Sequence, residues 1–139
     1  MDEPTYIVNV EVAVHRGAKY LFVERSAAEE HAAGLLSFPG GKVEAPPGEA
    51  DVIEATAIRE VEEEVSVTVA DPQYVHSTTF ETDTGVPCLN LITSARYVDG
   101  DATPRDPEEV AAVHWLPPAA ATDRDDLPEF TEHYLELVE

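Results

Sequence analysis

The feature that most constrains the fold is a single helix-forming segment in mid-chain, between stretches that alternate like β-strands. In residues 5–14, valines recur at alternate positions and Asn9 and Glu11 lie on the opposite face, which predicts a half-buried strand. Further strands are predicted at 20–23, 35–44, 74–81, 86–98 and 110–116, helices at 50–65 and 127–138, and a loop at 27–34. Strands outnumber helices without the regular alternation of a doubly wound sheet, so we expect a mixed α/β fold.

The length of the chain predicts one domain. Its 139 residues contain no internal repeat or linker, and 43% of them are apolar, which is enough for a core in a single domain over 1–139. No run of 18 apolar residues occurs, so we expect no membrane span. The first residues, Met1-Asp2-Glu3-Pro4, show no basic segment followed by an apolar one, so we expect no signal peptide. The single cysteine, Cys88, cannot form an internal disulfide. This is compatible with a reducing compartment, and we expect a cytoplasmic protein.

The charge balance limits the classes of molecule that the protein can bind. Acidic residues outnumber basic ones by 29 to 8, for a net charge of −21, and such a surface repels nucleic acid polymers and anionic membranes. The composition is similar to that of proteins from salt-in halophilic microbes, with an ordinary acidic protein as the alternative. At about 1 M salt the screening length falls to roughly 3 Å. We therefore expect activity to rise from low to molar KCl.

The predicted mid-chain helix carries the most distinctive chemistry. At about 100° per residue, Glu60, Glu63 and Glu64 fall within one arc of the helix. The apolar stripe on another side consists of Ile58, Val61 and Val65. Adjacent carboxylates repel one another, and Mg²⁺ or Mn²⁺ would relieve that repulsion, because both prefer oxygen ligands and commonly bridge to substrate phosphates. In a chain this rich in glutamate, a solvated helix face is the alternative.

A glycine pair precedes this helix. Gly40 and Gly41 follow Pro39 and precede Lys42, one of only two lysines, and glycine lets a backbone approach a ligand closely. Lys42 is therefore a candidate for contact with a substrate phosphate. A plain tight turn with an exposed lysine is the alternative.

The two segments together resemble the Nudix box of Nudix hydrolases, and the resemblance covers roughly residues 6–116. The box begins at Phe38-Pro39-Gly40-Gly41-Lys42-Val43-Glu44 and continues at Ala57-Ile58-Arg59-Glu60-Val61-Glu62-Glu63-Glu64. The second half matches the family's Arg-Glu-apolar-any-Glu-Glu register. The loop before the helix is four residues longer than the family's pattern, so either Glu49 or Asp51 takes the first acidic position, and Ser66 stands where the family has glycine.

The resemblance implies an α/β/α sandwich with a mixed sheet. It also implies metal-dependent hydrolysis of a pyrophosphate bond in a nucleoside diphosphate linked to another moiety. Carried over by position, Glu60 and Glu64 would be the principal ligands of Mg²⁺ or Mn²⁺. Glu63 would share the cation cluster, and the carbonyl of Gly41 would be a further ligand.

The remaining roles implied by the family stay open between alternatives. Arg59 would orient a carboxylate, either Glu49 or Asp51, and the general base would be Glu60 or one of Glu108 and Glu109. A non-catalytic Nudix-like domain that binds a nucleotide and regulates another process is the alternative function. The retained Glu60, Glu63 and Glu64 favour catalysis.

Aromatic residues and the terminal helix are further candidates. Phe80 and Trp115 could stack on a nucleobase or could simply be core aromatics. The helix predicted at 127–138 would pack against the domain, or would cover the substrate site or a partner in a homodimer. Which nucleotide is the substrate is not indicated by the sequence.

Overall fold

The structure, a computed structural model, describes residues 3–28 and 33–139. Part of the loop predicted at 27–34 therefore lies outside the described residues. The strands are β1 (Ile7–Arg16), β2 (Lys19–Arg25), β3 (Leu36–Ser37), β4 (Gly40–Lys42), β5 (Thr68–Glu81), β6 (Pro87–Asp99) and β7 (Val110–Leu116). The helices are α1 (Val52–Val65), α2 (Pro118–Thr122) and α3 (Glu129–Val138).

The described strands form one seven-stranded mixed sheet organised around β1. Its main path runs β3-β2-β1-β6-β5, with β4 paired to β1 and β7 paired to β2. β1 is antiparallel to β2 and β4 and parallel to β6. The mixed sheet predicted from the sequence is therefore confirmed.

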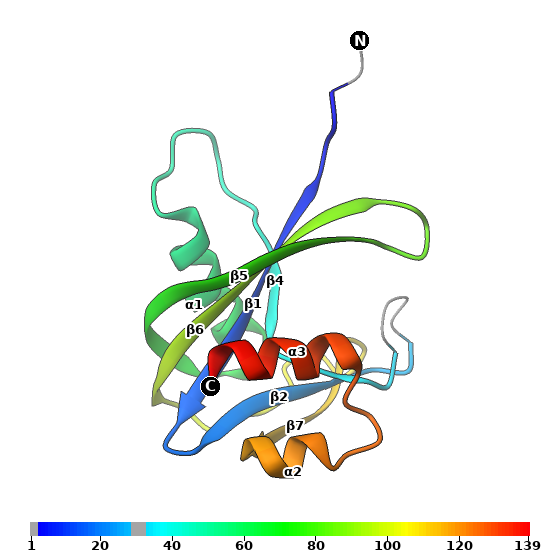
Figure 1. The fold of residues 1–139 in the computed structure, drawn as a ribbon. Helices are drawn as coiled ribbons and strands as arrows, with labels where there is room; N and C mark the ends of the chain where they lie inside the picture. Colours follow the sequence, from blue (N-terminus) through cyan, green and yellow to red (C-terminus); the bar gives the residue numbers. More distant parts are fainter. Residues whose placement is uncertain (1–2, 29–32) are drawn as a thin grey trace.

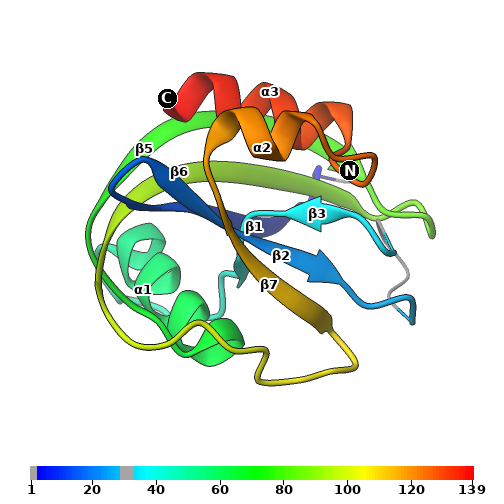
Figure 2. The same cartoon turned by 90° about the horizontal axis from the view of Figure 1, so that it is seen from below.

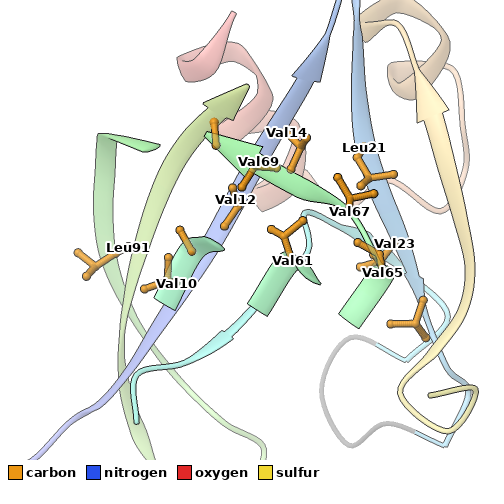
Figure 3. Packing of buried hydrophobic residues seen from close by; sticks show 13 residues of the cluster. Val10, Val12, Val14, Leu21, Val23, Val61, Val65, Val67, Val69 and Leu91 are labelled. Atoms are coloured by element: carbon orange, nitrogen blue, oxygen red, sulfur yellow. The ribbon is translucent and has the colours of Figure 1, made fainter. Parts of the chain in front are cut away.

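Helices cover both faces of this sheet. Figures 1 and 2 show α1 on one face and α2 and α3 on the other. On the α1 side, Val10, Val12 and Val14 of β1 pack with Val61 and Val65 of α1 (Figure 3). Alternate residues of a strand point to opposite faces, so the intervening positions of β1 face α3.

The prediction that β1 is half-buried is wrong. On the α3 side, Ala13 is fully buried in a second core with Tyr134 and Leu135 of α3. The strand is buried on both faces because it lies in the middle of a sheet covered on both sides. Asn9 and Glu11, which the alternation pattern placed on a polar face, are consequently partly buried and line a cavity rather than an open surface.

The helix α1 presents its apolar side to the sheet through Ala57, Val61 and Val65, which are all fully buried. Ile58, predicted in this stripe, is instead exposed, because the residues spaced four apart define the buried line and Ile58 flanks it. The helix ends at Ser66, whose φ is 63° and whose N–H donates to the Glu62 carbonyl at 3.0 Å.

Local backbone features explain where other predicted bounds were wrong. β5 begins at Thr68 rather than residue 74, because Asp71, at φ 54°, lies in a bulge through which pairing with β6 continues. The strand predicted at 35–44 is divided at Pro39 into β3 and β4. The terminal helix begins after Pro128 rather than at Leu127, since proline disfavours helical geometry in the preceding residue. The short helix α2 was not predicted.

Candidate active site

The carboxylate of Glu64 lies against the glycine strand β4. Glu64 Oε1 accepts a hydrogen bond from the Gly40 N–H at 3.3 Å. Burial raises the pKa of Glu64 to about 8, because removal from water disfavours the charged form. In the free protein a proton neutralises this carboxyl group. A bound cation would instead stabilise its ionised form.

Glu60 lies one helical turn earlier and against the second glycine. A Cβ atom on Gly41 would overlap the carboxylate of Glu60, so only glycine leaves room for this approach. Burial raises the pKa of Glu60, and the positive charge of Arg59 opposes that shift. Three neighbouring carboxylates raise it further, namely Glu63, Glu44 and Glu109.

Arg59 links Glu60 to the chain around the end of β4, and its carboxylate partner is not one of the two predicted. Its guanidinium donates to the carbonyls of Lys42 and Glu44 at 3.2 and 3.3 Å and to Glu60 Oε1 at 3.1 Å. The predicted orientation of Glu49 or Asp51 by Arg59 is therefore replaced by a contact with Glu60. Both Glu49 and Asp51 are exposed in the lengthened loop, and Asp51 adopts a left-handed conformation at the start of α1.

The three glutamates of the helix do not form one cluster. Glu63 is exposed and, with Arg59 and Glu62, borders a shallow depression on the outer side of α1. Within residues 3–28 and 33–139, no three His, Cys, Asp or Glu side chains are grouped so as to hold a metal ion. Glu60 and Glu64 flank the glycines, whereas Glu63 contributes its charge from the surface.

Glu108 and Glu109, the two candidates for the general base outside the helix, have different surroundings. Glu109 carries a charge that raises the pKa of both Glu60 and Glu64, and its carbonyl accepts the Ser26 N–H at 2.9 Å. Glu108 is capped locally by Asp106 Oδ1, which accepts its N–H at 3.0 Å. Of the two carboxylates suggested as a base, Glu109 is the one that acts on the α1 glutamates.

A cavity of about 310 Å³ adjoins Glu64 and Gly40. It lies between the sheet and α3, and its lining comprises Asn9, Glu11, Arg25, Ser37, Phe38, Gly40, Glu64, Thr78, Thr79, Phe80, Asn90, Phe130 and Tyr134. Phe80, a candidate for base stacking, belongs to this lining, and so does part of α3. Trp115 instead packs edge-on against Tyr97, and Lys42 is exposed.

Sequence reasoning missed the polar group inside this cavity. Asn9 Nδ2 donates to Asn90 Oδ1 at 2.8 Å, and Asn90 Nδ2 donates to Glu11 Oε2 at 2.6 Å. Burial raises the pKa of Glu11, and the Asn90 hydrogen bond, the charge of Arg25 and a backbone hydrogen bond from Phe38 act against the shift. The available signal was the pair of polar residues on one face of an otherwise apolar strand.

These features define an α/β protein with a ligand-sized cavity beside a carboxylate-bearing helix. The Glu60 and Glu64 carboxylates, which lie beside Gly41 and Gly40 of β4, are oxygen donors of the kind that a hard divalent cation prefers. No helix in the described ranges is both long and apolar enough to cross a membrane.

Comparison with known proteins identifies the family. The NUDIX domain family matches residues 5–138, so the chain belongs to the Nudix family, whose members are typically metal-dependent pyrophosphohydrolases. The expected α/β Nudix fold is thereby confirmed. No curated protein matches the sequence.

Solved structures show the same fold. A MutT NUDIX hydrolase from Burkholderia pseudomallei has a TM-score of 0.80 at 22% identity, over 98% of this chain and 100% of its own. The E. coli ORF135 protein has a TM-score of 0.66 at 28% identity, covering 96% and 88%. The NUDIX domain of Shewanella oneidensis NrtR, solved with ADP ribose, has a TM-score of 0.75 at 18% identity, covering 98% and 88%.

Proposed function

We propose that this protein hydrolyses a pyrophosphate bond in a nucleoside diphosphate linked to another moiety, using Mg²⁺ or Mn²⁺. The observation that carries the proposal is the approach of Glu64 to Gly40 and of Glu60 to Gly41, next to a cavity large enough for part of a nucleotide. Two half-buried carboxylates with raised pKa values suit a site that becomes charged when a cation arrives.

Glu60, Glu64 and the carbonyl of Gly41 would hold the cation. When bound, it would neutralise the diphosphate and lower the pKa of the attacking water. Arg59 would keep the Glu60 carboxylate in place through their 3.1 Å contact. Glu63 would add negative charge from the surface, and the Lys42 ammonium would contact a phosphate.

Glu109 would accept the proton of the attacking water, with Glu60 as the alternative base. A new P–O bond forms from the water oxygen to one phosphorus, and the bond from that phosphorus to the bridging oxygen breaks. The leaving phosphate takes the electron pair of the broken bond. The charge of Glu109 acts on both Glu60 and Glu64, which supports this role.

The nucleoside part of the substrate would occupy the cavity. Phe80 and Phe130 among its lining residues, neither of which is fully buried, offer aromatic surfaces to a planar base. The ADP ribose bound by the Shewanella NUDIX domain supports a nucleotide-type ligand. The position of α3 on this cavity also supports the alternative in which the terminal helix covers the substrate site as well as packing against the domain.

A phosphate-release screen tests the proposal. Nucleoside diphosphate sugars, ADP-ribose, dinucleoside polyphosphates and nucleoside triphosphates would be assayed with Mg²⁺ and with Mn²⁺, at about 0.1 M and about 2 M KCl because screening changes most over this range. We expect turnover of at least one compound, metal dependence and higher activity at high salt. Nucleotide binding without turnover under all conditions would contradict hydrolysis and support the non-catalytic alternative.

A further inference from the structure

A row of polar side chains crosses the sheet along one wall of the cavity. Asn9 of β1 lies opposite Asn90 of β6, and Asn90 lies opposite Thr78 of β5. All three residues line the cavity, because directly opposite residues of neighbouring strands point to the same face of a sheet. That face is the one that α3 covers, since Asn9 lies on the same side of β1 as Ala13, which packs in the core with α3.

Asn90, in the middle of the row, has no polar atom left for a ligand. Its side chain is buried, with only 2% of the residue exposed. Its Oδ1 accepts a hydrogen bond from Asn9 Nδ2 at 2.8 Å. Its Nδ2 donates to Glu11 Oε2 at 2.6 Å and lies 3.5 Å from the Tyr134 hydroxyl. Both ends of this amide are therefore occupied by groups of the protein.

Glu11 fixes which way the two amides point. An ionised carboxylate oxygen only accepts hydrogen bonds, so Asn90 turns its NH₂ toward Glu11 and its oxygen toward Asn9. Burial raises the pKa of Glu11, but the Asn90 hydrogen bond, the charge of Arg25 and a backbone hydrogen bond from Phe38 all favour the accepting form. Asn9 must then use its own NH₂ toward Asn90, which leaves its Oδ1 pointing away from this chain of hydrogen bonds.

The Oδ1 atom of Asn9 is the acceptor that remains at this end of the row. It has no hydrogen-bond partner in the part of the chain that the structure describes and, unlike Glu11 Oε1, it is not shielded from solvent. The hydroxyl of Thr78, at the other end of the row, can rotate to donate or to accept, whereas an amide oxygen only accepts. The cavity wall therefore presents a fixed acceptor that a ligand can reach.

We propose that Asn9 is a specificity-determining residue whose Oδ1 accepts a hydrogen bond from the nucleoside part of the substrate. This assignment rests on the proposed function and adds the residue that selects the ligand. A nucleoside can supply the donor in two ways, as an N–H of its base or as a hydroxyl of its sugar. A ligand that brings an acceptor to this position would place two lone pairs against each other, which weakens its binding.

The test compares two leucine variants by isothermal titration calorimetry, with EDTA present so that no turnover occurs. Asn9→Leu removes the acceptor, and Gln73→Leu, which removes an exposed amide of β5, is the matched control. The probes are AMP, GMP, CMP and UMP. We expect the parent and Gln73→Leu to share the same preferred nucleotide and the same affinity for it. Asn9→Leu should bind that nucleotide at least about tenfold more weakly, because a ligand donor is left unpaired in the cavity.

Analogues of the preferred nucleotide identify the donor and need no variant that might fail to fold. They are the 2′-deoxy form, the 3′-deoxy form and a form from which the base N–H donor has been removed. The parent should bind one of them about tenfold more weakly than the intact nucleotide, and Asn9→Leu should bind that analogue and the intact nucleotide equally. Weakened binding of a deoxy form assigns the sugar hydroxyl, and weakened binding of the base analogue assigns the base N–H.

Three results would overturn the assignment. They are no binding of any of the four nucleotides by the parent, parent-like affinity in a folded Asn9→Leu protein, and undiminished binding of every analogue by the parent. Phosphate release by the parent in spite of any of these results would leave the proposed hydrolysis intact. Conversely, nucleotide binding that depends on Asn9 in a protein that never releases phosphate would keep the assignment and refute the hydrolytic function.

Discussion

Glu64 and Glu11 are two buried carboxyl groups at different places in one cavity, and their neighbours separate their roles. Glu64 receives a backbone N–H from Gly40, faces the positive charge of Arg25 and feels the negative charges of Glu60 and Glu109. Glu11 also faces Arg25, but it receives the side-chain amide of Asn90 and a backbone hydrogen bond from Phe38. Burial raises the pKa of both. The carboxylates beside Glu64 suit a cation, whereas the amide and backbone donors at Glu11 hold its carboxyl group within the lining, so the same side chain acquires different chemistry from its surroundings.

The largest expected effect is a difference in kcat between variants of Glu64 and of Glu11. Glu64→Gln should lower kcat at least about 100-fold, because a neutral amide holds a divalent cation poorly. Glu11→Gln should change kcat far less, because Glu11 is not among the residues proposed to hold the cation. Steady-state assays of both variants at saturating Mg²⁺ make the comparison.

Glu62→Gln is the control for this experiment, since Glu62 is an exposed glutamate of the same helix. It should turn over like the parent. If Glu64→Gln matches Glu62→Gln in activity, then the cation assignment at the α1 end is wrong.

The pH dependence of stability should expose the buried charge of Glu64. The pKa is about 8 in the folded protein and near 4.5 when unfolded. As pH rises through this window the unfolded chain loses the proton first, so metal-free protein becomes less stable, and the loss is complete above pH 8. Glu64→Gln should remove a loss on the order of 5 kcal/mol. Denaturant unfolding with EDTA, at both ends of the window, measures it, and identical pH slopes for parent and variant would refute the burial argument.

The glycine pair connects the two regions and should respond differently at each position. A Cβ atom on Gly40 would overlap the Val10 carbonyl of β1, so Gly40→Ala should cost at least about 2 kcal/mol of folding free energy. At Gly41 the obstacle is the movable Glu60 side chain. Gly41→Ala should therefore keep most of its stability but lose about tenfold or more in kcat through misplacement of Glu60. If Gly40→Ala and Gly41→Ala lose equal amounts of folding free energy and of kcat, then this distinction between the two glycines is wrong.

The smallest expected effect concerns the end of the carboxylate helix alone. Ser66 adopts φ 63°, which glycine tolerates better than serine. Ser66→Gly should raise the free energy of unfolding by about 0.5–1 kcal/mol and leave nucleotide preference unchanged. Thermal denaturation of the parent and the variant is sufficient, and a lower melting temperature for Ser66→Gly would show that the cap is not strained.

The sequence predicted the part of the site on α1, with Glu60 and Glu64, better than the part on β1, with Glu11. The spacing of Glu60 and Glu64 on a helix determines their common side regardless of tertiary packing, and the structure places both against the glycines as expected. Glu63 shares the arc but is exposed, because an arc of helix surface is wider than the strip that meets a neighbouring strand.

The strand end was not predictable because alternation reveals only that a face is polar. Whether Glu11 meets solvent or a cavity depends on α3, which lies more than a hundred residues later in the chain and packs on that face. Asn90 reaches Glu11 through the parallel pairing of β1 with β6, a long-range register that local patterns do not encode. The partner of Arg59 was missed for a similar reason, because the lengthened loop carries Glu49 and Asp51 into solvent.

The central claim is that the α1 carboxylates and the glycine strand capture a divalent cation, and anomalous diffraction from Mn²⁺-soaked crystals tests it most directly. We predict a manganese peak bounded by the Glu60 and Glu64 carboxylates and the Gly41 carbonyl, and its loss in Glu64→Gln crystals treated in the same way. Ordered Glu60 and Glu64 side chains with no manganese between them at saturating concentration would contradict the claim.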